Sequence, residues 1–201
     1  MEHIASERIS WKQALAREKP LLMPVGHDGL TAKLIEQAGF TAMQVGGFAV
    51  AGARQGLPDI DLVHYAERHA AVKDIMSATS LPILVDADDG YGDVKNVTHT
   101  VRGFMALGMQ GLFIEDQQAP KECGHMDNKK VVPAEQMVGK VKAAVAAREK
   151  KDFFILARTD ARERRQDAVA RARRIRRHGL YDDPLPDHDP LPGDARHSPG
   201  G

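Results

Sequence analysis

Cysteine is almost absent from the 201-residue sequence, which contains only Cys123. A single cysteine cannot form an internal disulfide or an all-cysteine metal site, which suits a reducing compartment such as the cytoplasm. No run of residues approaches the roughly 18 consecutive apolar residues of a membrane span, and the first residues carry charges where a signal peptide needs an apolar stretch. We therefore expect a cytoplasmic protein that does not enter a membrane.

The sequence also has no excess of one charge, because its 28 Lys and Arg residues are balanced by 28 Asp and Glu residues. A balanced chain has no overall field to hold it on nucleic acid or on an anionic membrane. Hydrophobic residues make up 42% of the chain, which is enough for the core of one domain. Small molecules or other proteins are the expected partners, rather than nucleic acid.

Short apolar runs alternate with segments of helical periodicity. The five runs span residues 21–25, 41–45, 82–86, 111–115 and 153–157. Such runs are typical of buried parallel strands. Between them apolar residues recur at the helical period, and Pro133 occupies a position favoured as the first residue of a helix. In that helix we expect Lys140 and Lys142 on a solvated face. The alternation predicts an α/β fold with a parallel sheet.

This pattern ends after residue 161. Residues 162–178 are arginine-rich and able to form a helix, whereas residues 179–201 are rich in Pro and Asp, lack apolar periodicity and are predicted to be disordered. Eight strands close a TIM barrel, and five precede this change. We expect residues 1–161 to form an incomplete TIM-type (β/α) barrel, followed by the basic segment and an irregular C-terminal tail.

Acidic side chains end two neighbouring runs. Asp86 and Asp88 follow the third run and, by strand alternation, face the same way, while Glu115 ends the fourth. Hard oxygen ligands without His or Cys neighbours suit Mg²⁺ or Mn²⁺. The alternative is that such aspartates only cap the following helices, as we expect Asp93 to do.

The single cysteine lies in a polar loop. Lys121 and His125 flank Cys123, and cationic neighbours favour a thiolate and make the thiol a usable acid or base near neutral pH. Gly124 allows a sharp turn beside it. The alternative is a buried cysteine that acts as a small hydrophobic residue.

Two further positions suit the binding of an anion. Gly46 and Gly47 follow the second run and could offer backbone N–H groups, although a plain turn explains a glycine pair equally well. Arg158 follows the fifth run, where it could grip a carboxylate at two points or form a structural ion pair.

Six stretches together resemble a known family. They are GHDGLTAKLIEQAGF, GGFAVAGARQGLPD, LPILVDADDGYG, FIEDQQAPKECGH, KKVVPAEQMVGKVKAAV and ILARTDAR, and they cover roughly residues 20–162. Their content and order are similar to those of the isocitrate lyase/phosphoenolpyruvate mutase superfamily, in its methylisocitrate lyase and dimethylmalate lyase branch.

This resemblance implies a TIM-like barrel that assembles into homotetramers and holds Mg²⁺ beside a small 2-oxo acid. The positions that match the metal site are Asp59, Asp86, Asp88 and Glu115. Gly46 and Gly47 match the backbone that holds the substrate carboxylate, with Gly124 in the loop over it.

The resemblance also implies the catalytic residues. Arg158 matches the arginine that binds the oxo acid, Cys123 the thiol that protonates the departing fragment, and His125 the histidine beside it. The implied activity is a Mg²⁺-dependent carbon–carbon lyase, which cleaves a 2-hydroxy di- or tricarboxylate of the methylisocitrate or dimethylmalate type. A metal would stabilise the oxyanion of one product, while Lys121 and His125 neutralise the second carboxylate.

Three departures from the family pattern keep other functions open. Glu122 stands where the lyases carry Lys or Arg, Val45 stands where Ser or Thr is common, and the resemblance stops near Arg162. The last feature is what a truncated or frame-shifted chain would show. The alternatives are an enzyme of the oxaloacetate or phosphonate branch, and an inactive fragment that associates with full-length relatives.

Overall fold

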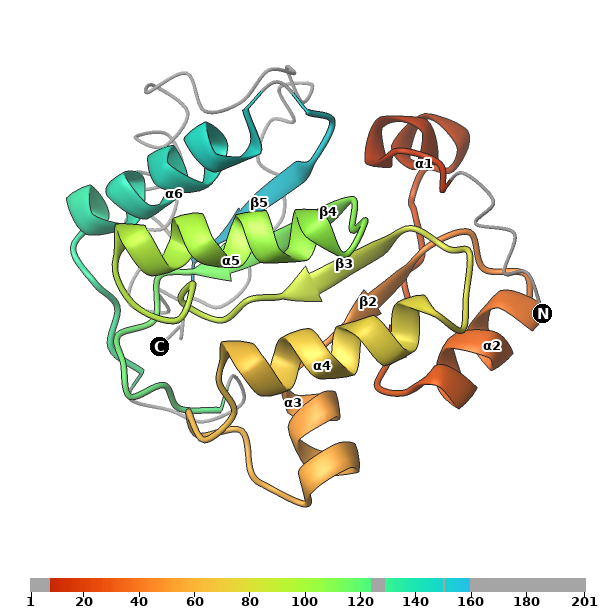
Figure 1. The fold of residues 1–201 in the computed structure, drawn as a ribbon, viewed down its shortest axis with the longest axis horizontal. Helices are drawn as coiled ribbons and strands as arrows, with labels where there is room; N and C mark the ends of the chain where they lie inside the picture. The colour runs from red at the N-terminus through yellow and green to blue at the C-terminus, as the bar shows by residue number, and fades with distance from the viewer. Residues whose placement is uncertain (1–7, 124–128, 150, 160–201) are drawn as a thin grey trace, which may run out of the picture.

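A computed structural model describes residues 8–123, 129–149 and 151–159 (Figure 1). The elements, in chain order, are α1 (Trp11–Arg17), β1 (Val25–Gly26), α2 (Gly29–Gln37), β2 (Met43–Val45), α3 (Gly47–Val50), the π-helical turn η1 (Ala51–Gln55), α4 (Tyr65–Met76), β3 (Ile83–Asp86), α5 (Val94–Ala106), β4 (Gly111–Glu115), α6 (Ala134–Arg148) and β5 (Phe154–Arg158). Strands and helices alternate, as the sequence pattern predicts.

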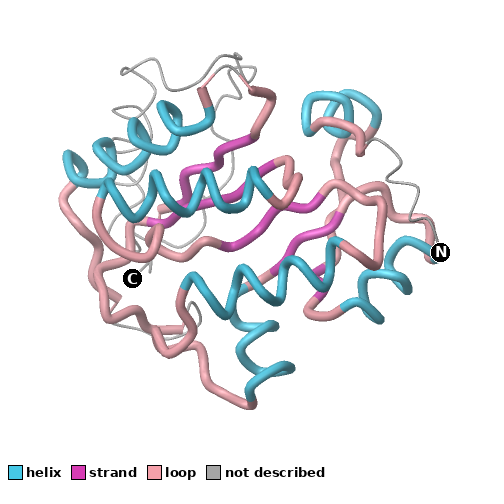
Figure 2. The backbone as a smooth tube through the Cα atoms, viewed as in Figure 1, coloured by secondary structure: helices cyan, strands magenta, loops and turns pink. Residues whose placement is uncertain are grey.

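The strands form one parallel sheet in the order β1-β2-β3-β4-β5. Each strand therefore lies beside its predecessor in the chain, which is the connectivity of a (β/α) barrel. Figures 1 and 2 show α4, α5 and α6 side by side on one face of this sheet. The predicted α/β fold is confirmed, and the described residues form an open five-stranded part of a barrel whose edges are β1 and β5.

Alternate strand residues separate the core into two clusters. The larger lies beneath α4, α5 and α6 and includes Ile83, Val85, Leu112 and Ile114. The smaller lies on the opposite face, where Leu84 and Phe113 pack with Trp11 of α1. The Trp11 ring lies 6.0 Å from that of Phe154. Because both faces of the strands are covered with apolar side chains, the runs read as continuously hydrophobic.

Helix starts follow their capping residues. The Asp28 carboxylate accepts a hydrogen bond from Thr31 N at 2.7 Å and caps α2, and Asp93 accepts from Lys95 N at 2.8 Å and caps α5. The cap expected at Asp93 is confirmed. Side-chain caps satisfy backbone N–H groups that the first turn of a helix leaves unpaired.

Three local predictions need correction. The first strand is only Val25–Gly26, at the end of the predicted run 21–25, because Pro24 has no N–H to donate to a sheet. Pro133 is the N-cap of α6, so the helix begins one residue later than predicted. Lys140 is 3% exposed, whereas Lys142 is exposed, so only one of the two lysines lies on a solvated face.

The predicted segments 162–178 and 179–201 lie outside the described residues. Within the described ranges, no helix combines the length and hydrophobicity that crossing a membrane requires.

Candidate active site

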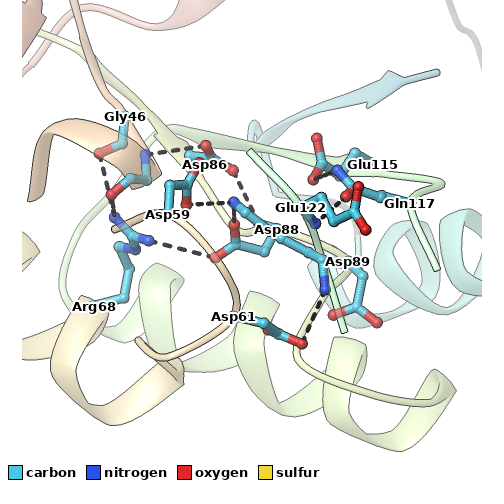
Figure 3. Close-up of polar contacts among 12 residues, drawn as sticks. Gly46, Asp59, Asp61, Arg68, Asp86, Asp88, Asp89, Glu115, Gln117 and Glu122 are labelled. Atoms are coloured by element: carbon cyan, nitrogen blue, oxygen red, sulfur yellow. Dashed lines mark hydrogen bonds and ion pairs between the residues drawn. The ribbon is translucent and has the colours of Figure 1, made fainter. Parts of the chain in front are cut away.

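Charged side chains gather where the carboxyl ends of β2 to β5 meet, the edge that carries the active site in barrel enzymes. Those that are almost fully buried include Arg68, Asp86, Asp88, Glu115 and Lys121. Figure 3 shows Arg68 on α4 and Asp86 and Glu115 at strand ends. Buried charges persist only when they are paired, so the contacts among them define the site.

Asp86 connects two strand ends. Its Oδ2 accepts a hydrogen bond from Gly47 N at 3.0 Å, and its Oδ1 accepts one from Asp88 N at 3.0 Å (Figure 3). A Cβ at position 47 would lie 2.9 Å from the Asp86 Oδ2, so this approach requires glycine. Burial and the charge of Asp88 raise the pKa of Asp86, against the opposing effect of Lys121 and Arg68.

The two aspartates converge for a different reason from the one that strand alternation suggests. Asp88 lies beyond the end of β3, with a left-handed φ of 49°, and Tyr91 in the same loop has a φ of 62°. Gly90 has a φ of 88°, and a Cβ there would lie 2.4 Å from Val97. Left-handed backbone in non-glycine residues is uncommon and marks functional loops. The loop turns Asp88 back so that its own N–H binds Asp86.

Lys140 holds this loop from the side of α6. Its Nζ donates to the backbone oxygen and to the Oδ2 of Asp89, both at 2.8 Å. The Lys140 ammonium group therefore fixes the loop to α6. This explains why Lys140, unlike Lys142, is buried.

Arg68 is a buried residue of the site that the sequence analysis missed. Its Nη1 donates to the carbonyl oxygens of Gly46 and Gly47, at 3.2 and 3.1 Å, and its Nη2 lies 3.4 Å from Asp88 Oδ2. Burial lowers the pKa of Arg68, but Tyr91 and Asp88 raise it overall. A signal was present, because Arg68 occupies the same helical stripe as the buried residues Ala71, Val72 and Ile75.

Lys121 lies in the loop after Gln117 that carries Cys123, here called the cysteine loop, and its side chain reaches the aspartates of the site. Its Nζ lies 3.0 Å from Asp59 Oδ1 and forms a second ion pair with Asp88, while its backbone N–H donates to Asp61 at 3.3 Å. Burial lowers the pKa of Lys121, but Asp88 and Asp86 raise it well above its ordinary value. Loop 58–63 lines a small hollow beside these residues. Lys121 therefore carries a positive charge at the centre of the acidic group.

Glu115 and Arg158 face each other across β4 and β5. Their paired backbone register places Arg158 Nη1 3.0 Å from Glu115 Oε2. Gln117 Nε2 donates to the other oxygen of Glu115 at 3.3 Å. The structural ion pair is thus formed, yet 38% of the Arg158 side chain remains exposed at the rim. Arginine side chains bind carboxylates, so this partly exposed residue is a candidate to contact a ligand.

Cys123 is half-buried on the segment that follows Lys121. The backbone N–H of Glu122, next to it, donates to Gln117 Oε1 (Figure 3). Gly124 and His125 lie outside the described residues, so their predicted roles have no structural description. Gly47 directs its N–H to Asp86, so in this arrangement it positions Asp86 rather than an external anion.

The predicted metal ligands have donor atoms that suit a divalent cation, but they are not arranged as a preformed metal site. In the part of the chain that the structure describes, no three His, Cys, Asp or Glu side chains form a ready metal site. Asp59 and Asp88 do converge on a cation, the ammonium group of Lys121. Carboxylate oxygens are the donors that Mg²⁺ and Mn²⁺ prefer. A divalent ion bound by these acids would therefore compete with Lys121.

A parallel (β/α) sheet with acidic and basic side chains at the carboxyl ends of its strands is the arrangement of the (β/α)-barrel class of proteins. The chain belongs to the phosphoenolpyruvate phosphomutase family, which it matches over residues 12–183. It is 41% identical over 151 residues to 2,3-dimethylmalate lyase of Eubacterium barkeri, covering 75% of this chain and 52% of that protein. It is 42% identical over 156 residues to 2-methylisocitrate lyase of Shewanella oneidensis, covering 78% and 53%.

Solved structures agree with this family. A crystal structure of 2,3-dimethylmalate lyase, a member of the PEP mutase/isocitrate lyase superfamily, matches with a TM-score of 0.75 and 31% identity, over 85% of this chain and 60% of that one. Phosphonopyruvate hydrolase in complex with oxalate and Mg²⁺ matches with a TM-score of 0.73 and 31% identity, over 85% and 61%. The chain spans about half the length of the curated relatives it matches.

Proposed function

We propose that this chain carries the site of a carbon–carbon lyase that cleaves a 2-hydroxy dicarboxylate, or a tricarboxylate of the methylisocitrate type, into a 2-oxo acid and a second carboxylate. The observation that carries the proposal is the position of Cys123. It lies half-buried on a segment whose neighbour Lys121 is anchored among Asp59 and Asp88. The thiol thus lies two residues along the chain from an ammonium group that paired carboxylates hold in place, which supports a common site. The names of the relatives, lyases of dimethylmalate and of methylisocitrate, support the substrate class.

Each side chain has a task in this reaction. Arg158, whose side chain is partly exposed at the rim, binds the carboxylate of the oxo-acid half. When the carbon–carbon bond breaks, its electron pair stays on the departing carboxylate fragment, and the hydroxyl group passes its proton to a carboxylate of the acidic group as the carbonyl forms. Cys123 gives its proton to the carbon of that fragment, and Lys121 offsets the charge that develops there.

A divalent cation fits beside these groups. Asp86 and Asp88, with Asp59 and Glu115, are the residues that would hold Mg²⁺ or Mn²⁺. The ion would supply charge stabilisation to the oxyanion of the oxo acid. The structure of phosphonopyruvate hydrolase with oxalate and Mg²⁺ supports this choice of ion.

The test is release of a 2-oxo acid from methylisocitrate, dimethylmalate and oxaloacetate in the presence of Mg²⁺. Wild type is expected to act on one of the first two, and Cys123→Ser to lower kcat by about 100-fold or more, the range for loss of a general acid. Turnover of oxaloacetate that survives Cys123→Ser would instead assign the protein to the oxaloacetate or phosphonate branch. No release above the Cys123→Ser background contradicts the proposed activity, and would leave an inactive fragment as the interpretation.

We place this enzyme in the cytoplasm as a homo-oligomer, with a tetramer as the expected assembly of the family. Light scattering on the full chain tests the assembly, and a monodisperse tetramer is the expected result. A monomer, or association only after a full-length relative is added, would contradict it.

A further inference from the structure

Gln117 is a buried residue whose side-chain amide forms hydrogen bonds through both its nitrogen and its oxygen. It is 2% exposed and lies two residues beyond Glu115. Its Nε2 donates to Glu115 Oε1 at 3.3 Å, and its Oε1 accepts from the backbone N–H of Glu122 (Figure 3). Rotating the amide by 180° would set oxygen against a carboxylate and N–H against N–H. The two partners therefore allow a single orientation.

Backbone contacts close the base of the cysteine loop close to Gln117. Gln118 N donates to Lys130 O at 2.8 Å, Val132 N donates to Asp116 O at 2.8 Å, and Gln117 forms an isolated bridge with Val131. The outgoing arm of the loop then carries Lys121, Glu122 and Cys123. Its position beyond the closed base depends on side-chain contacts.

Besides the hydrogen bond from the Lys121 backbone N–H to Asp61, two anchors hold the described part of that arm, and they lead to different acids. The first is Lys121, which pairs with Asp59 and Asp88. The second is the Glu122 N–H, which reaches Glu115 through Gln117. Glu122 directs its own side chain to solvent, so its anchor is the backbone alone. A backbone anchor explains how this position can exchange a cationic side chain for an anionic one without releasing the loop.

The geometry points to Gln117 as a positioning residue for Cys123. Its amide ties the peptide that precedes the thiol to Glu115, the carboxylate that pairs with Arg158. The thiol and the guanidinium are thus set relative to each other through one side chain. This role in catalysis rests on the proposed function of Cys123 as an acid, whereas the placement of Cys123 can be measured without turnover.

Because Cys123 is the only cysteine, iodoacetamide labels a single thiol in the full-length chain. Gln117→Met keeps the shape of the side chain and removes both hydrogen bonds. We expect alkylation about fivefold faster than in wild type, the change that loss of one net hydrogen bond allows, with faster hydrogen exchange at the Glu122 amide. Gln117→Asn, which is too short to reach Glu122, is the second variant and is expected to behave alike.

Two controls separate positioning from general loosening. Gln118→Met alters an exposed glutamine next in the chain and should leave alkylation unchanged. Val101→Ala removes buried volume in α5, away from the loop, and should lower the melting temperature without altering alkylation. Equal rates in wild type and in both Gln117 variants would overturn the inference, as would an equal acceleration in Val101→Ala.

Steady-state kinetics of the Gln117 variants test whether the placement of Cys123 matters for catalysis. Gln117→Met and Gln117→Asn should lower kcat with KM changed less than about twofold, because they displace the acid rather than the substrate-binding groups. A rise in KM at unchanged kcat would overturn the role. If wild type releases no 2-oxo acid, the proposed function fails, while the alkylation and exchange results still decide whether Gln117 positions Cys123.

Discussion

Two clusters at the same rim hold their charges in different ways. The β2–β3 cluster comprises Gly47, Arg68, Asp86, Asp88 and Lys121. The β4–β5 cluster comprises Glu115, Gln117 and Arg158. In the first, the arginine is 1% exposed and the charged side chains neutralise one another inside the protein. In the second, Glu115 is buried, but its arginine partner keeps 38% of its side chain exposed.

The difference assigns separate tasks to the two clusters. A buried and mutually paired group of charges gives little to a ligand directly, but it is rigid and holds its carboxylates in fixed positions. An arginine at the rim can bind an incoming carboxylate while its partner holds it in place. The cysteine loop is anchored to both, through Lys121 in one case and Gln117 in the other.

The largest effect is expected from breaking the charge pairing of the β2–β3 cluster. Arg68→Met should lower the free energy of unfolding by about 3–5 kcal/mol, because it removes one of the two buried cations that pair with Asp88 and the side-chain hydrogen bonds to the carbonyl groups of Gly46 and Gly47. Urea unfolding at pH 7 measures this. The matched variant Arg158→Met should cost only about 1 kcal/mol, since an exposed pair is weaker. Equal losses in the two variants would show that the clusters do not differ in this way.

A smaller effect is expected when Lys121 loses its charge. Lys121→Met should cost about 2 kcal/mol, because the acids of the cluster then repel one another. Addition of Mn²⁺ should raise the melting temperature of this variant more than that of wild type, since the metal no longer competes with the ammonium group. Thermal unfolding with and without Mn²⁺, compared with a Lys142→Met control on the exposed face of α6, provides the measurement. An equal Mn²⁺ response in all three proteins would contradict competition at this position.

The smallest effect concerns a carboxylate remote from both clusters. Glu36 accepts hydrogen bonds from Thr79 and Ser80. Burial raises the pKa of Glu36, but the hydrogen bonds from Ser80 and Thr79 together lower it by more. The pKa in the folded state therefore lies below the ordinary value. Such a group stabilises the fold above its unfolded pKa, and the contribution is lost as the pH falls through the folded pKa.

Glu36→Gln should therefore destabilise the protein near pH 6, and this difference from wild type should shrink as the pH falls to about 3. Chemical unfolding of both proteins across that range is the measurement. A difference that stays constant with pH would mean that the carboxylate charge at Glu36 makes no contribution.

Much of the fold follows from local pattern. The runs that became β2, β3, β4 and β5 are apolar on both faces because helices cover one side and the second apolar cluster covers the other. Asp93 was identifiable as a helix cap from its position alone. The length of β1 and the start of α6 were not, because both depend on which backbone groups find partners across the sheet or in the first turn.

The sequence by itself determined the α/β alternation, the acids at strand ends and the single cysteine beside Lys121. It could not determine which charges would meet. Lys140 was predicted on a solvated helix face and Arg68 drew no prediction, and only the packing of α4 and α6 against the rim brought them to Asp89 and Asp88. Gln117 carried no charge to draw notice, and its role arises from the return of the loop to Glu115. A charge or an amide can be read along the chain, whereas its partner is chosen by distance in space, which only the tertiary structure fixes.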